Sequence, residues 1–204
     1  MLERFHSERE DIVECGCDEA GRGCLAGPVV AAAVVFPRDF CCEQLNDSKQ
    51  MSDRKRRMLR PIIEENALAF AVAFVDNETI DRINILNASF LAMSNAVRKL
   101  RIKPDLLLID GNRFRTDLDI SFKCMVKGDA RFQSIAAASI LAKTYRDDFM
   151  LKAHESHPQY CWNRNMGYPT KQHREAIRIF GLTSLHRKSF NLSCPEEIDS
   201  SQEK

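Results

Sequence analysis

Five short apolar runs alternate with longer segments of helical character, and this alternation limits the fold more than any other feature of the chain. Most of these runs are bounded by turn-forming residues, a pattern typical of strands, and the run over 106–109 is interpreted as a short buried strand. The expected strands cover residues 12–17, 29–36, 68–75, 106–109 and 120–126. Strands interleaved with helices predict an α/β domain with a mixed five-stranded sheet. Because Gly21-Arg22-Gly23 follows the first strand, we expect the first two strands to pair antiparallel through a short glycine turn.

The helical segments carry start and stop signals. Ser52 can cap the first helix, within which Pro61 requires a kink or a boundary. Thr170 can cap the last helix, and Gly181 can end it. The expected helices cover residues 52–66, 85–100, 132–154 and 170–181.

Length and composition exclude several classes of protein. A chain of 204 residues is the size of one large domain, and its 44% hydrophobic content excludes disorder over most of its length. The eight cysteines contain no C-x-x-C pair, and such a long chain does not need disulfides for stability. No apolar run is long enough to span a bilayer, and the first residues lack the apolar core of a signal peptide. We therefore expect a cytoplasmic protein with free thiols and no membrane contact.

The net charge of +1 conceals an uneven distribution along the chain. Residues 1–120 carry 17 basic and 20 acidic side chains, whereas residues 121–192 carry 12 basic and 5 acidic ones. A basic stretch joined to an acidic half suits a protein that binds phosphate backbones and has its chemistry among carboxylates, although a solvated basic surface has the same composition. We expect one catalytic domain over residues 1–192, with a basic helical lobe over 155–192 and an acidic flexible tail over 193–204.

Acidic residues stand at the ends of three of the predicted strands. Asp18-Glu19 ends the first, Asp110 ends the fourth, and Asp129 follows the fifth. Taken singly, Asp110 reads as a turn residue and Asp129 as part of a loop, so only their joint placement indicates a site. Strand ends are where α/β sheets build sites, and carboxylates gathered there would repel unless a cation neutralised them. Oxygen ligands alone favour Mg²⁺ or Mn²⁺ over zinc.

A longer motif surrounds the first acidic pair. The stretch Cys17-Asp18-Glu19-Ala20-Gly21-Arg22-Gly23, with Ala26-Gly27-Pro28, closely resembles the signature of type 2 ribonuclease H, specifically bacterial ribonuclease HII. Cys24 departs from the family, which commonly has proline there. The likeness continues in order through Asn46-Asp47-Ser48-Lys49, Asp110-Gly111-Asn112, Lys127-Gly128-Asp129, the run from Ile135 to Lys143, Gly167-Tyr168-Pro169-Thr170 with His173, and His186-Arg187-Lys188-Ser189-Phe190.

The resemblance implies a ribonuclease H-like fold and a metal-dependent endonuclease. Carried over by position, the family's catalytic metal ligands fall on Asp18, Glu19, Asp110 and Asp129. In that family two Mg²⁺ or Mn²⁺ ions activate a water and stabilise the departing 3′ oxygen, which leaves 3′-hydroxyl and 5′-phosphate ends. The implied substrates are RNA/DNA hybrids and duplex DNA with embedded ribonucleotides, cut on the 5′ side of the ribonucleotide. The implied role is ribonucleotide removal during DNA replication and repair.

The resemblance also suggests which residues contact the substrate. Gly21, Arg22 and Gly23 would sense the 2′-hydroxyl with their backbone, and Tyr168 would pack on the adjoining sugar. Without the resemblance, the glycines read as a hairpin turn and Tyr168 as a half-buried aromatic. The candidates for phosphate or nucleic-acid contacts are Lys49, Arg22, Asn112, Ser139 and Lys143. The run Arg54-Lys55-Arg56-Arg57 is interpreted mainly as surface, because four successive residues cover most of a helix circumference.

Several alternatives stay open. A ribonuclease HIII-like enzyme is disfavoured for two reasons. That family lacks the Gly-Arg-Gly turn, which is present here as Gly21-Arg22-Gly23. It also has an additional domain before the catalytic one, whereas only about 11 residues precede the first strand here. A catalytically idle hybrid-binding module is disfavoured because clustered negative charge without metal would not help a polyanion binder. His173 and His186 lack a second ligand pair at zinc spacing, so we expect a structural or substrate-orienting role for them. We place Arg187 and Lys188 on the basic, duplex-facing surface. We expect a monomer, and the acidic tail is a candidate contact for a replication partner.

Overall fold

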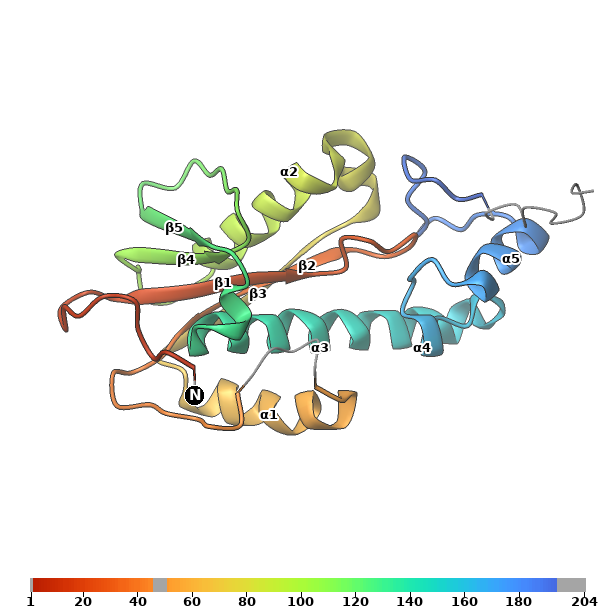
Figure 1. The fold of residues 1–204 in the computed structure, drawn as a ribbon. Coiled ribbons are helices and arrows are strands. Elements are labelled where there is room, and N and C mark those ends of the chain that lie inside the picture. The colour runs from red at the N-terminus through yellow and green to blue at the C-terminus, as the bar shows by residue number, and fades with distance from the viewer. Residues whose placement is uncertain (1, 46–50, 194–204) are drawn as a thin grey trace, which may run out of the picture.

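A mixed sheet of five strands forms the centre of the computed structural model, which describes residues 2–45 and 51–193 (Figure 1). The strand order is β3-β2-β1-β4-β5. The strands are β1 (Glu14–Ala20), β2 (Val29–Val35), β3 (Ala69–Val75), β4 (Leu106–Asp110) and β5 (Ser121–Met125). All five predicted strands are confirmed, as is the antiparallel pairing of β1 with β2. β4 lies parallel to both β1 and β5.

Helices cover both faces of this sheet (Figure 1). The helices are α1 (Asp53–Asn66), α2 (Asn77–Arg98), α3 (Gln133–Ser156), α4 (Trp162–Asn165) and α5 (Lys171–Phe180), and the 3-10 turns are η2 (Gly128–Ala130) and η3 (Pro158–Tyr160). α2 packs on one face of the sheet, and α1 and α3 lie on the other. None of the helices in the described ranges is both long and apolar enough to cross a membrane.

Small side chains let α3 approach the sheet closely. β2 is buried along its whole length and contains only Val and Ala, as expected for a strand covered on both faces. On the neighbouring strand, a Cβ at Gly16 would lie 2.3 Å from the carbonyl carbon of Ser134 in α3. The first turns of α3 are correspondingly alanine-rich and fully buried. This contact places the middle of α3 beside the carboxyl end of β1.

Three local features differ from the sequence expectations. The link between β1 and β2 spans residues 21–28 and is therefore a loop of eight residues rather than a short turn. α1 continues through Pro61, whose side chain is exposed to solvent. α2 starts at Asn77, well before the predicted residue 85, because the Asp76 side chain accepts a bond of 2.7 Å from the backbone N–H of Thr79. Within α2, Asn84 has φ 65° and ψ 164°, and this kink interrupts the helical periodicity that the sequence shows.

The remaining signals are confirmed by the structure. Ser52 caps α1, Thr170 caps α5 through the N–H of His173, and Gly181 follows the end of α5. The cysteines at described positions all carry free thiols. A third apolar cluster lies at the carboxyl end of α3, where Tyr160 and Trp162 pack against Met150 and against residues of α5.

Candidate active site

Three carboxylates from separate parts of the chain meet at one edge of the sheet. Asp18 lies near the end of β1, Asp110 ends β4, and Asp129 lies in η2 after β5. Because β1 and β4 are parallel neighbours with Cys17 opposite Ile109, the two strands deliver Asp18 and Asp110 side by side. One oxygen atom from each of the three carboxylates lies within 4.8 Å of the others. The joint placement expected from the sequence is therefore present for these three acids.

The Lys-Gly-Asp loop holds Asp129 against this pair. Lys127 adopts a left-handed backbone conformation with φ 54°, which turns the chain into η2. The backbone N–H of Gly128 then donates a bond of 2.7 Å to Oδ1 of Asp110. A side chain at Gly128 would place a Cβ only 2.6 Å from Cδ1 of Ile135, so glycine permits the close packing. This packing fixes the position of the third carboxylate relative to the second.

Two of the three carboxylates are buried, and the negative charges around Asp18 repel one another. Asp18 is only 4% exposed and Asp129 only 2%. The pKa of Asp18 is raised well above its usual value, first by burial and then by the negative charges of Glu19 and Asp110. A hydrogen bond with Ser139 and one of 2.7 Å from the backbone N–H of Glu19 oppose this rise. Oxygen donors that repel one another are suited to a hard divalent cation, so the donor set fits Mg²⁺ or Mn²⁺.

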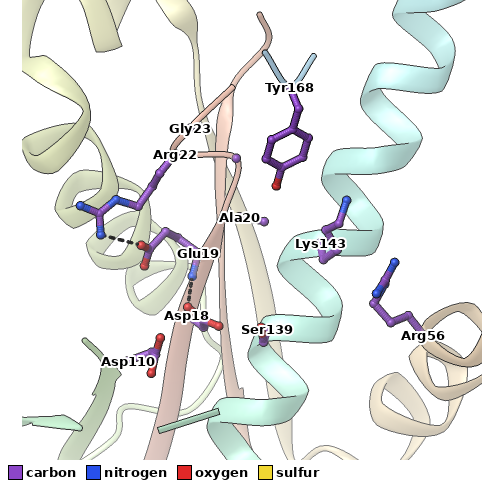
Figure 2. Close-up of a pocket in the computed structure, with 11 residues that line it drawn as sticks. Asp18, Glu19, Ala20, Arg22, Gly23, Arg56, Asp110, Ser139, Lys143 and Tyr168 are labelled. Atoms are coloured by element: carbon purple, nitrogen blue, oxygen red, sulfur yellow. Dashed lines mark hydrogen bonds and ion pairs between the residues drawn. The ribbon is translucent and has the colours of Figure 1, made fainter. Parts of the chain in front are cut away.

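Glu19 occupies a different position from the other three acids. Its carboxylate lies outside the cluster and faces Arg22, with Oε1 3.1 Å from Nη1 (Figure 2). The Glu19 side chain is 9% exposed, whereas that of Arg22 is 50% exposed. The structure thus gathers three of the four predicted ligands and pairs the fourth with the arginine of the Gly-Arg-Gly turn.

A hollow of about 530 Å³ opens beside the carboxylates (Figure 2). It brings together most of the residues that the sequence singles out. Its lining consists of Asp18, Glu19, Ala20, Gly21, Arg22, Gly23, Arg56, Asp110, Ser139, Lys143 and Tyr168. Asp129 is not among these lining residues, and Asn112 is exposed and lines a separate hollow of about 450 Å³. Lys49 lies outside the described residues.

Lys143 and Tyr168 form the wall opposite Arg22. Nζ of Lys143 lies 2.6 Å from Oδ1 of Asp147 and 5.7 Å from the centroid of the Tyr168 ring. Tyr168 is 38% exposed, and its ring points into the hollow (Figure 2). The wall therefore combines an exposed aromatic surface with a cation that is partly neutralised by a buried acid.

Two buried arginines hold the loop over residues 21–28. Arg146 donates to the carbonyls of Ala26 and Pro28, and Arg187 donates to those of Arg22 and Gly27. Both arginines are fully buried, so the expectation that Arg187 belongs to a duplex-facing surface is wrong. The requirement for glycine is clear at Gly21, where φ is 95° and a Cβ would lie 2.0 Å from Nε of Arg146.

Arg56 is a site residue that the sequence interpretation assigned mainly to the surface. Its side chain is only 12% exposed, and it lines the hollow from α1 (Figure 2). The signal was present in the helical spacing, because Leu59 and Ile63, three and seven positions later, are the buried residues of α1. The other members of the basic run are partly or fully exposed.

The sequence comparisons with known proteins agree on one family, and solved structures show the fold. A sequence profile of the family described as Ribonuclease HII matches residues 15–193. Ribonuclease HII of Phocaeicola vulgatus is 61% identical over 183 residues, which cover 90% of this chain and 91% of the relative. The solved ribonuclease H2 of Pyrococcus horikoshii has a TM-score of 0.74 at 23% identity and covers 88% of this chain and 94% of its own. The solved structure of Bst-RNase HIII in complex with Mn²⁺ has a TM-score of 0.73 at 22% identity, and the match covers 91% of this chain and 69% of that protein's chain. These two structures show a ribonuclease H-like fold.

Proposed function

Because the chain belongs to the ribonuclease HII family and is therefore an endonuclease of the ribonuclease H type, we propose that it cleaves RNA/DNA hybrids and duplex DNA with embedded ribonucleotides. In hybrids it cuts the RNA strand, and in duplex DNA it incises on the 5′ side of the ribonucleotide. The gathering of Asp18, Asp110 and Asp129 within 4.8 Å carries this proposal. Such a cluster costs stability unless a cation neutralises it, and its oxygen-only donor set fits a hard divalent cation.

The metal ligands proposed are Asp18, Asp110 and Asp129, with Glu19 as the fourth acid. When bound, two Mg²⁺ or Mn²⁺ ions supply an activated water and stabilise the departing 3′ oxygen, which yields 3′-hydroxyl and 5′-phosphate ends. Burial of Asp18 and Asp129 limits competing water, and the hydrogen bond from Gly128 orients Asp110. Glu19 supports this assignment less directly, because its carboxylate bonds to Arg22.

Recognition of the ribose is assigned to the Gly21-Arg22-Gly23 turn and Tyr168, which lie across the same hollow. A Cβ at Gly23 would meet nothing within 4 Å, so the backbone there is open to an approaching sugar. The 2′-hydroxyl both donates and accepts hydrogen bonds, and backbone groups can satisfy it in both senses. The Tyr168 ring supplies an apolar face for the sugar beside this turn.

The cationic and neutral polar groups around the hollow suit a phosphate backbone. Arg22, Lys143 and Arg56 surround it, and Ser139 adds a hydroxyl at its floor. Charge-assisted bonds from arginine and lysine to phosphate position the strand without reading its sequence. Asn112 and Lys49 remain proposed contacts. A cytoplasmic location, a monomeric state and a basic lobe over 155–192 are further proposals. A contact of the acidic tail with replication proteins is also proposed, and most of that tail lies outside the described residues.

Strand-scission mapping tests this function directly. The parent protein and Asp110→Asn are compared on an RNA/DNA hybrid and on a DNA duplex with one ribonucleotide, with Mn²⁺ or Mg²⁺ present. We expect the parent to cut 5′ of the ribonucleotide, and the variant to bind both duplexes without cutting them. Binding without cutting by the parent at every metal concentration would instead indicate an idle hybrid-binding module.

A further inference from the structure

A buried histidine holds the backbone of Tyr168. Nδ1 of His173 lies 3.0 Å from the carbonyl oxygen of Tyr168, and His173 is fully buried. His173 does not line the hollow, whereas Tyr168 does. The N–H of Tyr168 is held separately, because it donates a bond of 2.8 Å to the carbonyl of Asn165.

The neighbours of His173 determine which of its nitrogens carries the proton. The indole N–H of Trp162 can only donate, and it lies 3.0 Å from Nε2 of His173, so Nε2 is the acceptor. The proton of neutral His173 is therefore on Nδ1, where it is donated to the Tyr168 carbonyl. His186 fits the same arrangement: its Nδ1 accepts from the N–H of Thr183 at 2.9 Å, which leaves a proton on its Nε2, 3.3 Å from Nε2 of His173.

The Tyr168 segment is also tied to the loop over residues 21–28. The carbonyl of Gly167 accepts a bond of 2.8 Å from the N–H of Leu25. Gly167 has φ 79°, and a Cβ there would lie 2.7 Å from the carbonyl oxygen of Ala26. Arg146 adds a bond of 2.8 Å to the carbonyl of Met166. Small shifts of the backbone at Tyr168 would therefore change the position of its ring relative to the Gly-Arg-Gly turn.

We infer that His173 is a positioning residue for sugar recognition, which acts by donating its Nδ1 proton to the Tyr168 carbonyl. Trp162 and His186 hold the imidazole in the tautomer and orientation that this donation requires. The inference rests on the proposed role of Tyr168 and adds to it a cause for the placement of the ring. A buried residue in the first turn of α5 thus controls how the site recognises a ribose.

Two isosteric substitutions separate this role from general stability. The amide nitrogen of His173→Asn takes the place of Nδ1 and can still donate to the Tyr168 carbonyl. The amide of His173→Gln takes the place of Nε2 and can still accept from Trp162. His173→Gln leaves the Tyr168 carbonyl without its donor, whereas His173→Asn leaves the N–H groups of Trp162 and His186 without their acceptor. We therefore expect His173→Asn to lose at least as much melting temperature as His173→Gln. Because Trp162 is the only tryptophan, its fluorescence reports which variant keeps the indole bond.

The readout is kcat/KM on a duplex with one ribonucleotide, measured for both variants, for Tyr168→Ala and for the double variants. We expect His173→Gln to lose about tenfold, the worth of one such hydrogen bond, and His173→Asn to stay within about twofold of the parent. His173→Gln should cause no further loss in the Tyr168→Ala background. Equal losses of kcat/KM in the two His173 variants would overturn the inference about His173 and leave the proposed role of Tyr168 standing. The same holds if the loss of kcat/KM in His173→Gln adds to that of Tyr168→Ala. Full activity of Tyr168→Ala would overturn the proposed role of Tyr168 together with it.

Discussion

Replacing Asp18 with asparagine should stabilise the metal-free protein while abolishing cleavage. One oxygen atom from each of Asp18, Asp110 and Asp129 lies within 4.8 Å of the other two. At that separation two unit charges repel by about 3.5 kcal/mol for an effective dielectric constant of about 20. Protonation relieves part of this energy, so we expect Asp18→Asn to raise the free energy of unfolding by about 2 kcal/mol. For a chain of this length, the gain corresponds to a melting temperature about 4 to 8 °C higher.

The pH dependence of this gain has a definite sign. The pKa of Asp18 is raised in the folded protein, so the folded state binds its proton more tightly than the unfolded state does. The destabilisation by Asp18 therefore grows as the pH rises above the unfolded pKa of about 4, until the folded pKa is passed. The stabilising effect of Asp18→Asn should accordingly be small near pH 4 and larger at neutral pH.

Thermal unfolding in the presence of a chelator measures the effect, and Asp147→Asn provides a matched control. Asp147 is also buried, but both of its oxygens bond to Nζ of Lys143, so its removal should lower the melting temperature. Added Mn²⁺ should stabilise the parent more than Asp18→Asn, because the variant lacks one ligand. A fall in melting temperature for Asp18→Asn as large as that for Asp147→Asn would refute the idea that the carboxylates repel one another.

Three further predictions follow from other parts of the structure. Burial and the nearby His173 lower the pKa of His186 to about 4, so the contribution of neutral His186 to the free energy of unfolding is present above about pH 6.5 and decreases by up to about 3 kcal/mol as the pH falls through 4. Urea unfolding of the parent and of His186→Asn at several pH values should show a weaker acid dependence in the variant. Gly21→Ala should lower both the melting temperature and cleavage, whereas Gly23→Ala should leave the melting temperature within about 0.5 °C and still reduce cleavage of a single-ribonucleotide duplex. Equal melting temperatures for the two variants would contradict the prediction that only Gly21 is required by the fold. Arg56→Ala should raise KM with little change in kcat and should weaken the salt dependence of duplex binding, and an unchanged salt dependence would place Arg56 outside the phosphate path.

The strands were predictable because their signal is local. β2 and β4 are short apolar runs with turn residues on either side, and the burial of these two strands removes the need for polar alternation. The start of α2 was not predictable in this way. Its first turns depend on the cap at Asp76, and the kink at Asn84 shifts the apolar face between the two halves, so a single helical period fits only the second half.

The site was predictable only as far as strand ends and motif positions determine it. Asp18 and Asp110 meet because their strands are parallel neighbours, which the strand-end argument anticipates. The burial of Arg187 and the pairing of Glu19 with Arg22 depend on how the loop over 21–28 folds onto α3, and no sequence pattern encodes that contact. Arg56 is an intermediate case, because its helical face could have been read from Leu59 and Ile63.

Anomalous diffraction from crystals soaked with Mn²⁺ tests the proposed metal site most directly. We expect anomalous density at the edge of the sheet, in contact with oxygen atoms of Asp18, Asp110 and Asp129, and its loss in Asp110→Asn crystals grown and soaked in the same way. Ordered carboxylates with no anomalous density between them at saturating Mn²⁺, or density that persists unchanged in Asp110→Asn, would contradict the assignment of these acids as the metal ligands of the nuclease.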